Sequence, residues 1–147
     1  MKNNINTLKQ CGFACIGKWS LGEYKSTKHL SHMSGLKYSI DEHNKAQGFV
    51  YAFSVDDEVV YVGETTQAMG ERFNSYRYGN PLVRDTDNRV KKRITKALEE
   101  RQKVLIWFYS QTTDFQFAGE SLSISVNKPI EEELIRRLSP RLNTKKI

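Results

Sequence analysis

Two short runs of strand-forming residues near the middle of the chain restrict its fold more than any other feature. The first run is Phe49–Val55 and the second is Val59–Val62, and the acidic segment Asp56-Asp57-Glu58 separates them. β-Branched and aromatic residues on both sides of a short polar segment are typical of a β-hairpin. The sequence therefore predicts two neighbouring antiparallel strands here.

The length of the hairpin loop decides whether Tyr51 and Tyr61 share a face of the sheet. A three-residue loop pairs Val55 with Val59 and puts both tyrosines on one face. A two-residue turn puts them on opposite faces, because side chains alternate along a strand. We expect the three-residue loop and the shared face.

The spacing of apolar residues after the hairpin predicts helices around one further strand. Helices are expected over residues 67–78, 87–101 and 129–138. Thr65 or Thr66 is the expected N-cap of the first helix. The apolar run within residues 103–109 predicts a buried central strand. Residues 111–127 are expected to be a long loop with a short strand at 122–126.

With 147 residues the chain is long enough for a single domain with its own core. We predict a small α/β (α+β) domain with a central, mainly antiparallel sheet flanked by helices. Its core is expected to span residues 48–143. Residues 1–46 are expected to be an N-terminal extension that adds a strand near 12–19, followed by loop and a short helical turn.

The two cysteines favour a structural role over a metal site. Cys11, Phe13 and Cys15 alternate, so on a strand they would share one buried face. A zinc site with His29 and His32 is the alternative, but this histidine spacing is shorter than that of a zinc finger.

An excess of basic residues favours a polyanionic partner. The formal net charge is +6 and the pI is near 9.3, although many basic proteins bind no nucleic acid. Basic residues gather at the start of the second predicted helix, where acidic residues are few, so a phosphate contact is favoured over a merely solvated face. These residues are Arg84, Arg89, Lys91, Lys92, Arg93 and Lys96.

No apolar run approaches the roughly 18 residues of a membrane span. The first residues also lack the apolar stretch of a signal peptide. We therefore expect an intracellular protein that does not enter a membrane.

Glu131 stands out among the acidic residues of the last predicted helix. Glu132 and Glu133 are each followed four residues later by an arginine, as in surface helical pairs, whereas Glu131 is followed by Ile135. A carboxylate aligned with an apolar stripe must be paired, protonated or metal-bound. The alternative is that all three glutamates only complement the helix dipole.

Arg72 and Tyr76 lie four residues apart, so they share a face of the first predicted helix. An arginine there could bind a phosphate through two hydrogen bonds, with help from the tyrosine hydroxyl. The alternative is an ordinary exposed, polar helix.

These residues together resemble the GIY-YIG nuclease superfamily. Phe49-Val50-Tyr51 and Tyr61-Val62-Gly63 resemble its two tyrosine motifs. Arg72 and Glu131 stand where the superfamily has its helical arginine and its metal-binding glutamate. The resemblance covers about two thirds of the chain, roughly residues 48–143, and is greatest to small phage endonuclease II-type enzymes and compact restriction endonucleases. Phe49 in place of a glycine, and Tyr76 where many members have histidine, are departures from the usual motifs.

The resemblance implies an Mg²⁺- or Mn²⁺-dependent endonuclease that hydrolyses phosphodiester bonds. Glu131 would hold the metal ion, and Arg72 would neutralise charge on the phosphate. Tyr51, with its pKa lowered by Arg72 and the cation, would deprotonate or orient the attacking water, and Tyr61 and Tyr76 would position oxygens. The implied catalytic residues are Tyr51, Tyr61, Arg72, Tyr76, Glu131 and Asn143.

The implied partner is double-stranded DNA, bound in the cytoplasm of a bacterium or a phage-infected cell. A protein of this size would cut both strands most simply as a homodimer or higher homo-oligomer. Lys18 is implied as a further DNA-binding residue beside the basic residues given above. The alternative function is a catalytically inactive, basic DNA-binding module on the same scaffold.

Overall fold

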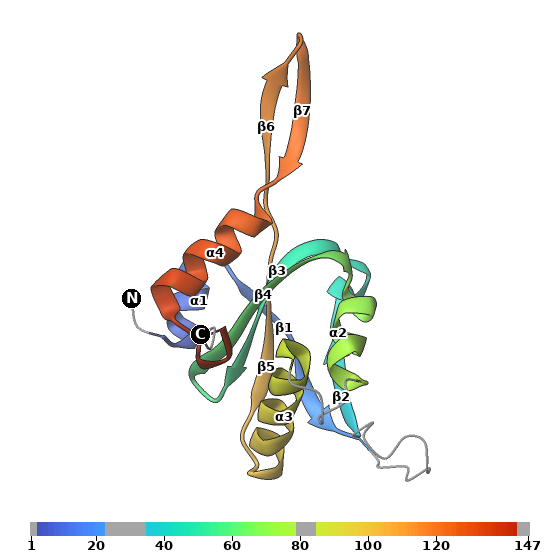
Figure 1. The fold of residues 1–147 in the computed structure, drawn as a ribbon, viewed down its shortest axis with the longest axis vertical. Helices are drawn as coiled ribbons and strands as arrows, with labels where there is room; N and C mark the ends of the chain where they lie inside the picture. The colour runs from blue at the N-terminus through green and yellow to red at the C-terminus, as the bar shows by residue number, and fades with distance from the viewer. Residues whose placement is uncertain (1–2, 23–34, 79–84, 144–147) are drawn as a thin grey trace.

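A five-stranded antiparallel sheet forms the centre of the molecule (Figure 1). The computed structural model describes residues 3–22, 35–78 and 85–143. The strand order is β2-β1-β5-β3-β4, and β6 and β7 form a separate hairpin that projects from the body. The strands are β1 (Ala14–Leu21), β2 (Leu36–Ile40), β3 (Gln47–Val55), β4 (Glu58–Ala68), β5 (Val104–Tyr109), β6 (Thr112–Phe117) and β7 (Glu120–Ser125). The predicted α+β class, with helices flanking a mainly antiparallel sheet, is confirmed.

Helices cover both faces of this sheet. The α-helices are α1 (Ile5–Gln10), α2 (Met69–Arg77), α3 (Thr86–Glu99) and α4 (Asn127–Leu138), and the 3₁₀ turns are η1 (Glu42–Lys45) and η2 (Arg141–Asn143). Apolar residues of α2 and α3 pack with one side of the sheet, and those of α1 and α4 pack with the other. Strand β5 lies between β1 and β3, and its side chains pack into the apolar clusters on both faces of the sheet, as its apolar run predicted.

The face under α2 and α3 has an aromatic core. Trp19 contacts Phe53 and Tyr76 edge-on, with ring centroids 5.6 and 6.3 Å apart. Phe73 lies with its ring centroid 5.3 Å from that of Tyr51. Tyr51 and Phe73 are fully buried, and edge-to-face pairs of this kind add to the hydrophobic gain of burial. The tyrosines of the hairpin are therefore part of a rigid core.

The β3–β4 hairpin reaches the predicted face by a different route. Val55 pairs with Glu58, so the turn has two residues and the predicted three-residue loop is wrong. A bulge follows, in which Phe53 pairs with Tyr61 and Ser54 with Val59. The extra residue in β4 restores the alternation that the short turn shifts. Tyr51 and Tyr61 share a face, as predicted.

The N-terminal segment contributes more structure than its sequence indicates. Helix α1 and strand β2 were not predicted, and β1 is bulged between Cys15 and Gly17. Because that bulge shifts the alternation, Cys15 is exposed, and Cys11 lies half-buried before the strand begins. The prediction of a shared buried face for the two cysteines is therefore wrong.

Two other local predictions are also wrong. Thr65 and Thr66 belong to β4, which extends to Ala68 because Ala68 still pairs with Gln47, so neither threonine caps α2. Residues 112–125 form the β6–β7 hairpin, so the predicted long loop is wrong, although the short strand predicted at 122–126 overlaps β7. No helix in the described parts of the chain is long and apolar enough to span a membrane.

Gly63 provides a test of this packing, because it faces the ring of Tyr51. A Cβ atom at residue 63 would lie 2.4 Å from Cζ of Tyr51. We predict that Gly63→Ala lowers the free energy of unfolding by about 1–3 kcal/mol through overpacking. The control is Gly70→Ala in α2, where the nearest atom to the new Cβ is the Tyr38 hydroxyl at 3.7 Å. Urea unfolding of both variants measures the difference, and equal stability would contradict the prediction.

Candidate active site

Arg72 on α2 is the centre of a compact hydrogen-bonded cluster. Its Nε donates to the Tyr51 hydroxyl at 2.8 Å, and Nη2 donates to the Tyr76 hydroxyl at 2.6 Å. The Tyr51 and Tyr76 hydroxyls are themselves 2.6 Å apart, so one donates to the other. Nη1 donates to Ser75 Oγ at 2.7 Å, and the guanidinium also forms two hydrogen bonds with the carboxylate of Asp87, at 3.1 and 3.2 Å.

Three elements position these groups. Tyr51 comes from β3, Asp87 from the first turn of α3, and Arg72 and Tyr76 share a face of α2 one turn apart. The guanidinium carbon lies 4.5 Å from the centre of the Tyr76 ring, a cation–π distance. The predicted shared face of Arg72 and Tyr76 is thus present, but it points into the molecule.

Burial controls the protonation of the cluster. It raises the pKa of Tyr51 and of Tyr76 well above the usual value, because an ionised phenol would be desolvated there, and Tyr61 adds to the effect on both. Burial alone would lower the pKa of Arg72, but Tyr51, Tyr76 and Asp87 outweigh it and the guanidinium stays protonated. Arg72 lowers the pKa of Tyr51, as expected from the sequence, but burial outweighs it, so Tyr51 is a neutral phenol in the protein alone.

Tyr61 connects this cluster to a pocket at the edge of the sheet. Its ring centroid lies 6.2 Å from those of Tyr51 and Tyr76, and the residue is 7% exposed. The pocket has a volume of about 480 Å³ and lies beside the edge strand β4, between α3 and α4. Its lining includes Tyr61, Arg89, Lys128, Glu131 and Asn143. The side chain of Glu131 is 13% exposed and forms an ion pair with Lys128 Nζ at 3.0 Å.

Asn143 is tied to the backbone of the edge strand. Its Oδ1 accepts from the amide N–H of Val62 at 2.8 Å, and its Nδ2 donates to the carbonyl of the same residue at 2.7 Å. The carboxamide thus pairs with β4 as a neighbouring strand would. It holds the end of the chain against the strand that carries Tyr61.

The basic residues of α3 divide between the surface and the interior. Lys92 and Lys96 are exposed and Arg93 is half-buried. Arg89 lines the pocket and donates to the carbonyl of Leu142 at 3.1 Å. Lys91 is 2% exposed, and burial lowers its pKa, so it lies inside the molecule and not on the exposed basic face of α3.

Of the two remaining predicted residues, one lies away from the site and the other falls outside the residues that the structure describes. Lys18 is exposed, but it pairs with Leu105, whose side chain packs with the apolar cluster on the face opposite Tyr51. Arg84 lies outside the described residues.

Asp87, Ser75 and Lys128 were not predicted as part of the site. An acidic residue in a first helical turn is common for electrostatic reasons, so the sequence around Asp87 carries no signal of its contact with Arg72. Lys128 precedes Glu131 by three residues, the helical spacing of an ion pair, and this spacing could have identified it.

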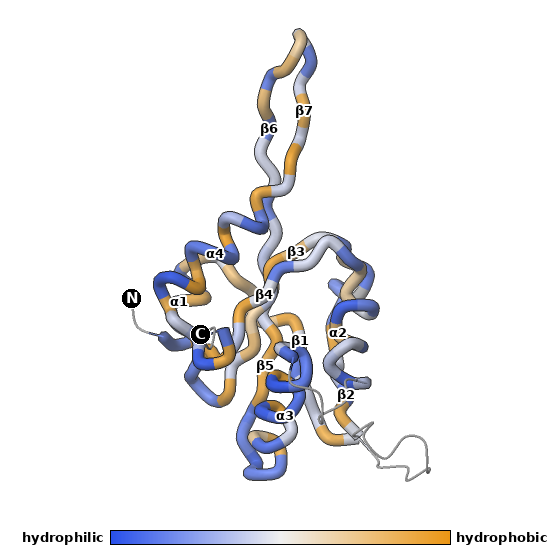
Figure 2. The backbone as a smooth tube through the Cα atoms, viewed as in Figure 1, coloured by the Kyte–Doolittle hydropathy of each residue, from blue (hydrophilic) through white to orange (hydrophobic). Residues whose placement is uncertain are grey.

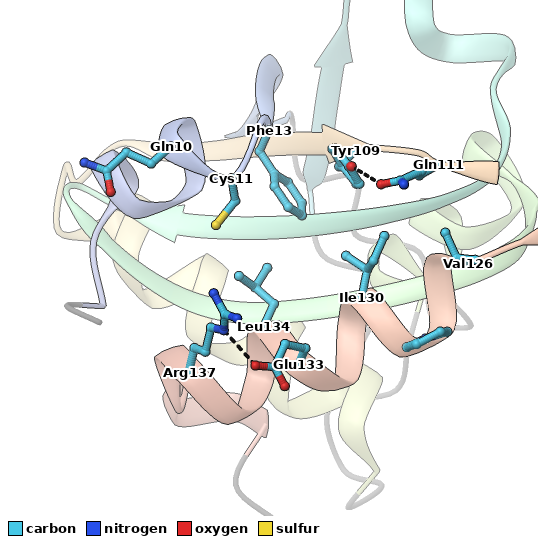
Figure 3. Close-up of a pocket in the computed structure, with 11 residues that line it drawn as sticks. Gln10, Cys11, Phe13, Tyr109, Gln111, Val126, Ile130, Glu133, Leu134 and Arg137 are labelled. Carbon is cyan, nitrogen blue, oxygen red and sulfur yellow. Dashed lines mark hydrogen bonds and ion pairs between the residues drawn. The ribbon is translucent and has the colours of Figure 1, made fainter. Parts of the chain in front are cut away.

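A larger pocket lies on the opposite face of the sheet (Figure 3). Its volume is about 660 Å³, and α1, the end of β5 and α4 enclose it. Apolar side chains such as Phe13, Ile130 and Leu134 form most of its wall, with the ion pair between Glu133 and Arg137 at one end. Because it contains none of the residues predicted for catalysis, we place the candidate site in the pocket beside β4.

Comparison with known proteins gives a structural match only. No known family profile and no curated sequence matches the chain. The solved structure of a glutamate-to-alanine mutant of bacteriophage T4 EndoII matches with a TM-score of 0.70 over 97% of this chain and 99% of that chain, at 22% identity. The two chains share a fold. The restriction endonuclease HPY188I in complex with product DNA has a TM-score of 0.48 at 14% identity, over 97% of this chain and 83% of that chain.

The raised pKa values of Tyr51 and Tyr76 predict instability in alkali. Both phenols stay neutral in the folded protein but ionise in the unfolded chain above about pH 10. The neutral phenols contribute fully to the free energy of unfolding below that pH. As the pH rises further, this free energy falls by up to about 1.4 kcal/mol per pH unit for each tyrosine.

Urea unfolding across this pH range, followed by tyrosinate absorbance, tests this prediction. Tyr76→Phe should flatten the pH dependence of stability. Tyr78→Phe, at a residue that is 46% exposed, should leave it unchanged. If both phenols ionise in the folded protein, the prediction is wrong.

Proposed function

We propose that this protein is a metal-dependent DNA endonuclease of the GIY-YIG type. The observation that carries the proposal is the cluster of Arg72 with Tyr51 and Tyr76, joined through Tyr61 to a pocket that contains Glu131. A fully hydrogen-bonded arginine beside a carboxylate-lined pocket suits the chemistry of a phosphodiester. The fold shared with T4 EndoII, an endonuclease by its name, supports the same proposal.

The donor groups of the pocket fit one hard divalent cation. The described residues contain no group of three acidic, histidine or cysteine side chains that could enclose a metal ion. Mg²⁺ is commonly held by one or two carboxylates and keeps several waters, so Glu131 alone is sufficient. Its carboxylate already binds a cation, the ammonium of Lys128, whose pKa this hydrogen bond raises. A bound Mg²⁺ would polarise the scissile phosphate and stabilise the leaving oxygen.

The protein's own residues would bind the phosphate and orient water. Arg72 remains positively charged, so it would neutralise negative charge on the bound phosphate. Tyr51 and Tyr76 would hold the guanidinium in place as its hydrogen-bond partners. Tyr61 reaches the pocket and is the tyrosine placed to orient the attacking water.

DNA would approach along α3. Arg89, Lys92, Arg93 and Lys96 recur at helical spacing, and Arg89 continues this basic face into the pocket. Exposed cations of this kind bind the backbone by displacing counterions, so affinity should fall steeply as salt increases.

The β6–β7 hairpin is the surface through which we propose that copies of the chain associate. Its cross-strand pairs put all of its large apolar side chains on one face, and Figure 2 shows apolar residues along both arms. These residues and their exposed fractions are Phe115 (42%), Phe117 (67%), Leu122 (38%) and Ile124 (46%). An isolated hairpin is barely stable in water, and exposed apolar patches mark interaction sites. A second copy would cover this face and supply the second catalytic site that cutting both strands requires.

The nuclease proposal predicts cleavage of supercoiled plasmid with Mg²⁺ and none with EDTA. Glu131→Gln should reduce the rate at least about a hundredfold because it removes the metal ligand, while DNA binding persists. Glu133→Gln, on the same helix but in the wall of the pocket on the opposite face of the sheet, is the matched control and should retain activity. Binding of DNA by the unaltered protein without cleavage would instead support an inactive DNA-binding module.

The association proposal predicts that Phe115→Ser together with Phe117→Ser shifts the protein to monomers in sedimentation velocity. The control is Gln116→Ser, on the polar face between them, which should leave the oligomer intact. A monomer for the unaltered protein, free and on DNA, would contradict the proposal.

A further inference from the structure

Every N–H of the Arg72 guanidinium already has a partner inside the protein. Nε and one Nη2 hydrogen contact Tyr51 and Tyr76, and one Nη1 hydrogen contacts Ser75. The remaining N–H of Nη1 and of Nη2 both donate to Asp87. Since a guanidinium has five N–H donors, none is left for a substrate.

Asp87 occupies the edge of the guanidinium that a phosphate would need. The two Nη groups point their outer hydrogens in parallel, and this fork binds carboxylate and phosphate with the same geometry. Tyr51 and Tyr76 hold the other edge and are fully buried. Of the groups around Arg72, only Asp87 combines a negative charge with the geometry of a phosphate.

The position of Asp87 allows it to move. Its side chain is 30% exposed, whereas that of Arg72 is 18% exposed. It lies in the first turn of α3 between Thr86 and Arg89, which both line the pocket beside Tyr61. In the described residues, the hydrogen bonds of its carboxylate all go to Arg72. Displacing Asp87 would therefore expose the guanidinium next to the candidate site without breaking the core.

We propose that Asp87 is an internal stand-in for the DNA phosphate, which holds Arg72 in place and is displaced when substrate binds. This inference rests on the proposed nuclease function. In the free protein, Asp87 neutralises a partly buried cation and fixes its orientation toward the two tyrosines. When DNA binds, a phosphate oxygen pair takes its place, so Asp87 weakens substrate binding while it keeps the site assembled.

The opposite possibility is that Asp87 stays in place and only orients Arg72. The two possibilities predict opposite effects of Asp87→Asn, which keeps the size of the side chain and removes its charge. A displaced competitor weakens binding, so its neutralisation tightens the complex. A permanent support strengthens the site, so its neutralisation loosens the complex or has no effect.

The test measures the affinity for a short DNA duplex by fluorescence anisotropy in EDTA, with Glu131→Gln as the parent protein. We expect Asp87→Asn to lower the Kd about tenfold. The matched control is Asp85→Asn, which removes the same charge from the same helix end. Asp85 is exposed and caps α3 through the amide of Asn88, and asparagine caps a helix as well as aspartate does. The control should change the Kd less than twofold, and thermal unfolding should show that both variants are folded.

A second measurement uses inorganic phosphate as the probe. The Nε–H resonance of Arg72 is followed by NMR as phosphate is added, and it should respond at lower concentration in Asp87→Asn than in Asp85→Asn. The inference would be overturned if Asp87→Asn and Asp85→Asn changed the affinity for DNA and for phosphate equally. It would also be overturned if Asp87→Asn bound DNA more weakly than the parent. Either result would leave the nuclease proposal standing. If the parent binds no DNA, the proposed function itself fails, and this inference fails with it.

Discussion

The structure around the candidate site depends on one partly buried positive charge. A guanidinium removed from water is costly unless each donor has a partner, and Arg72 obtains its partners from three separate elements. Strand β3 supplies Tyr51, α2 supplies Tyr76 and Ser75, and α3 supplies Asp87. The position of α3 relative to the sheet is thereby linked to the position of α2. Tyr51 and Tyr76 remain neutral in spite of this cation, because the effect of burial on the pKa of each phenol outweighs the lowering effect of Arg72.

The geometry of β4 then determines where this cluster meets solvent. Its bulge turns Tyr61 toward the same face as Tyr51, and its position at the sheet edge leaves one side of the strand without a neighbouring strand. Asn143 takes the place of that neighbour at Val62, and Tyr61 and Glu131 line a pocket beside the strand. The candidate site is therefore at an edge of the sheet, where a long polymer can approach.

The sequence predicted those parts of the structure that depend on local pattern. The apolar run of β5 and the spacing of apolar residues in α3 and α4 identify these elements, because burial there repeats with a regular period. The bulges in β1 and β4 were not predictable, since each depends on pairing with a distant strand. In the β6–β7 hairpin, the strand predicted at 122–126 overlaps β7, but β6 was missed because the alternating pattern there faces no core.

The same distinction applies to the candidate site. The motif residues Tyr51, Arg72 and Tyr76 were selected from the sequence, and they lie together in the structure. Their protonation was not predictable, because the pKa of a phenol depends on how completely the fold removes water from it. The burial of Lys91 and the contact of Asp87 with Arg72 were hidden for a related reason, since charged residues on a helix look alike until the packing of that helix is known.

The order of the strands also has a consequence for synthesis of the chain. Val104 of β5 pairs with Trp19 on one side and Val55 on the other, so β1 and β3 both wait for a strand that leaves the ribosome much later. Pairing over such separations is slow, because loop closure must precede any gain from contact. Glu131 and Asn143 follow later still, after the whole sheet is available. Tyr51, Arg72 and Tyr76 therefore precede β5 in the chain, whereas Glu131 and Asn143, which line the pocket, follow it.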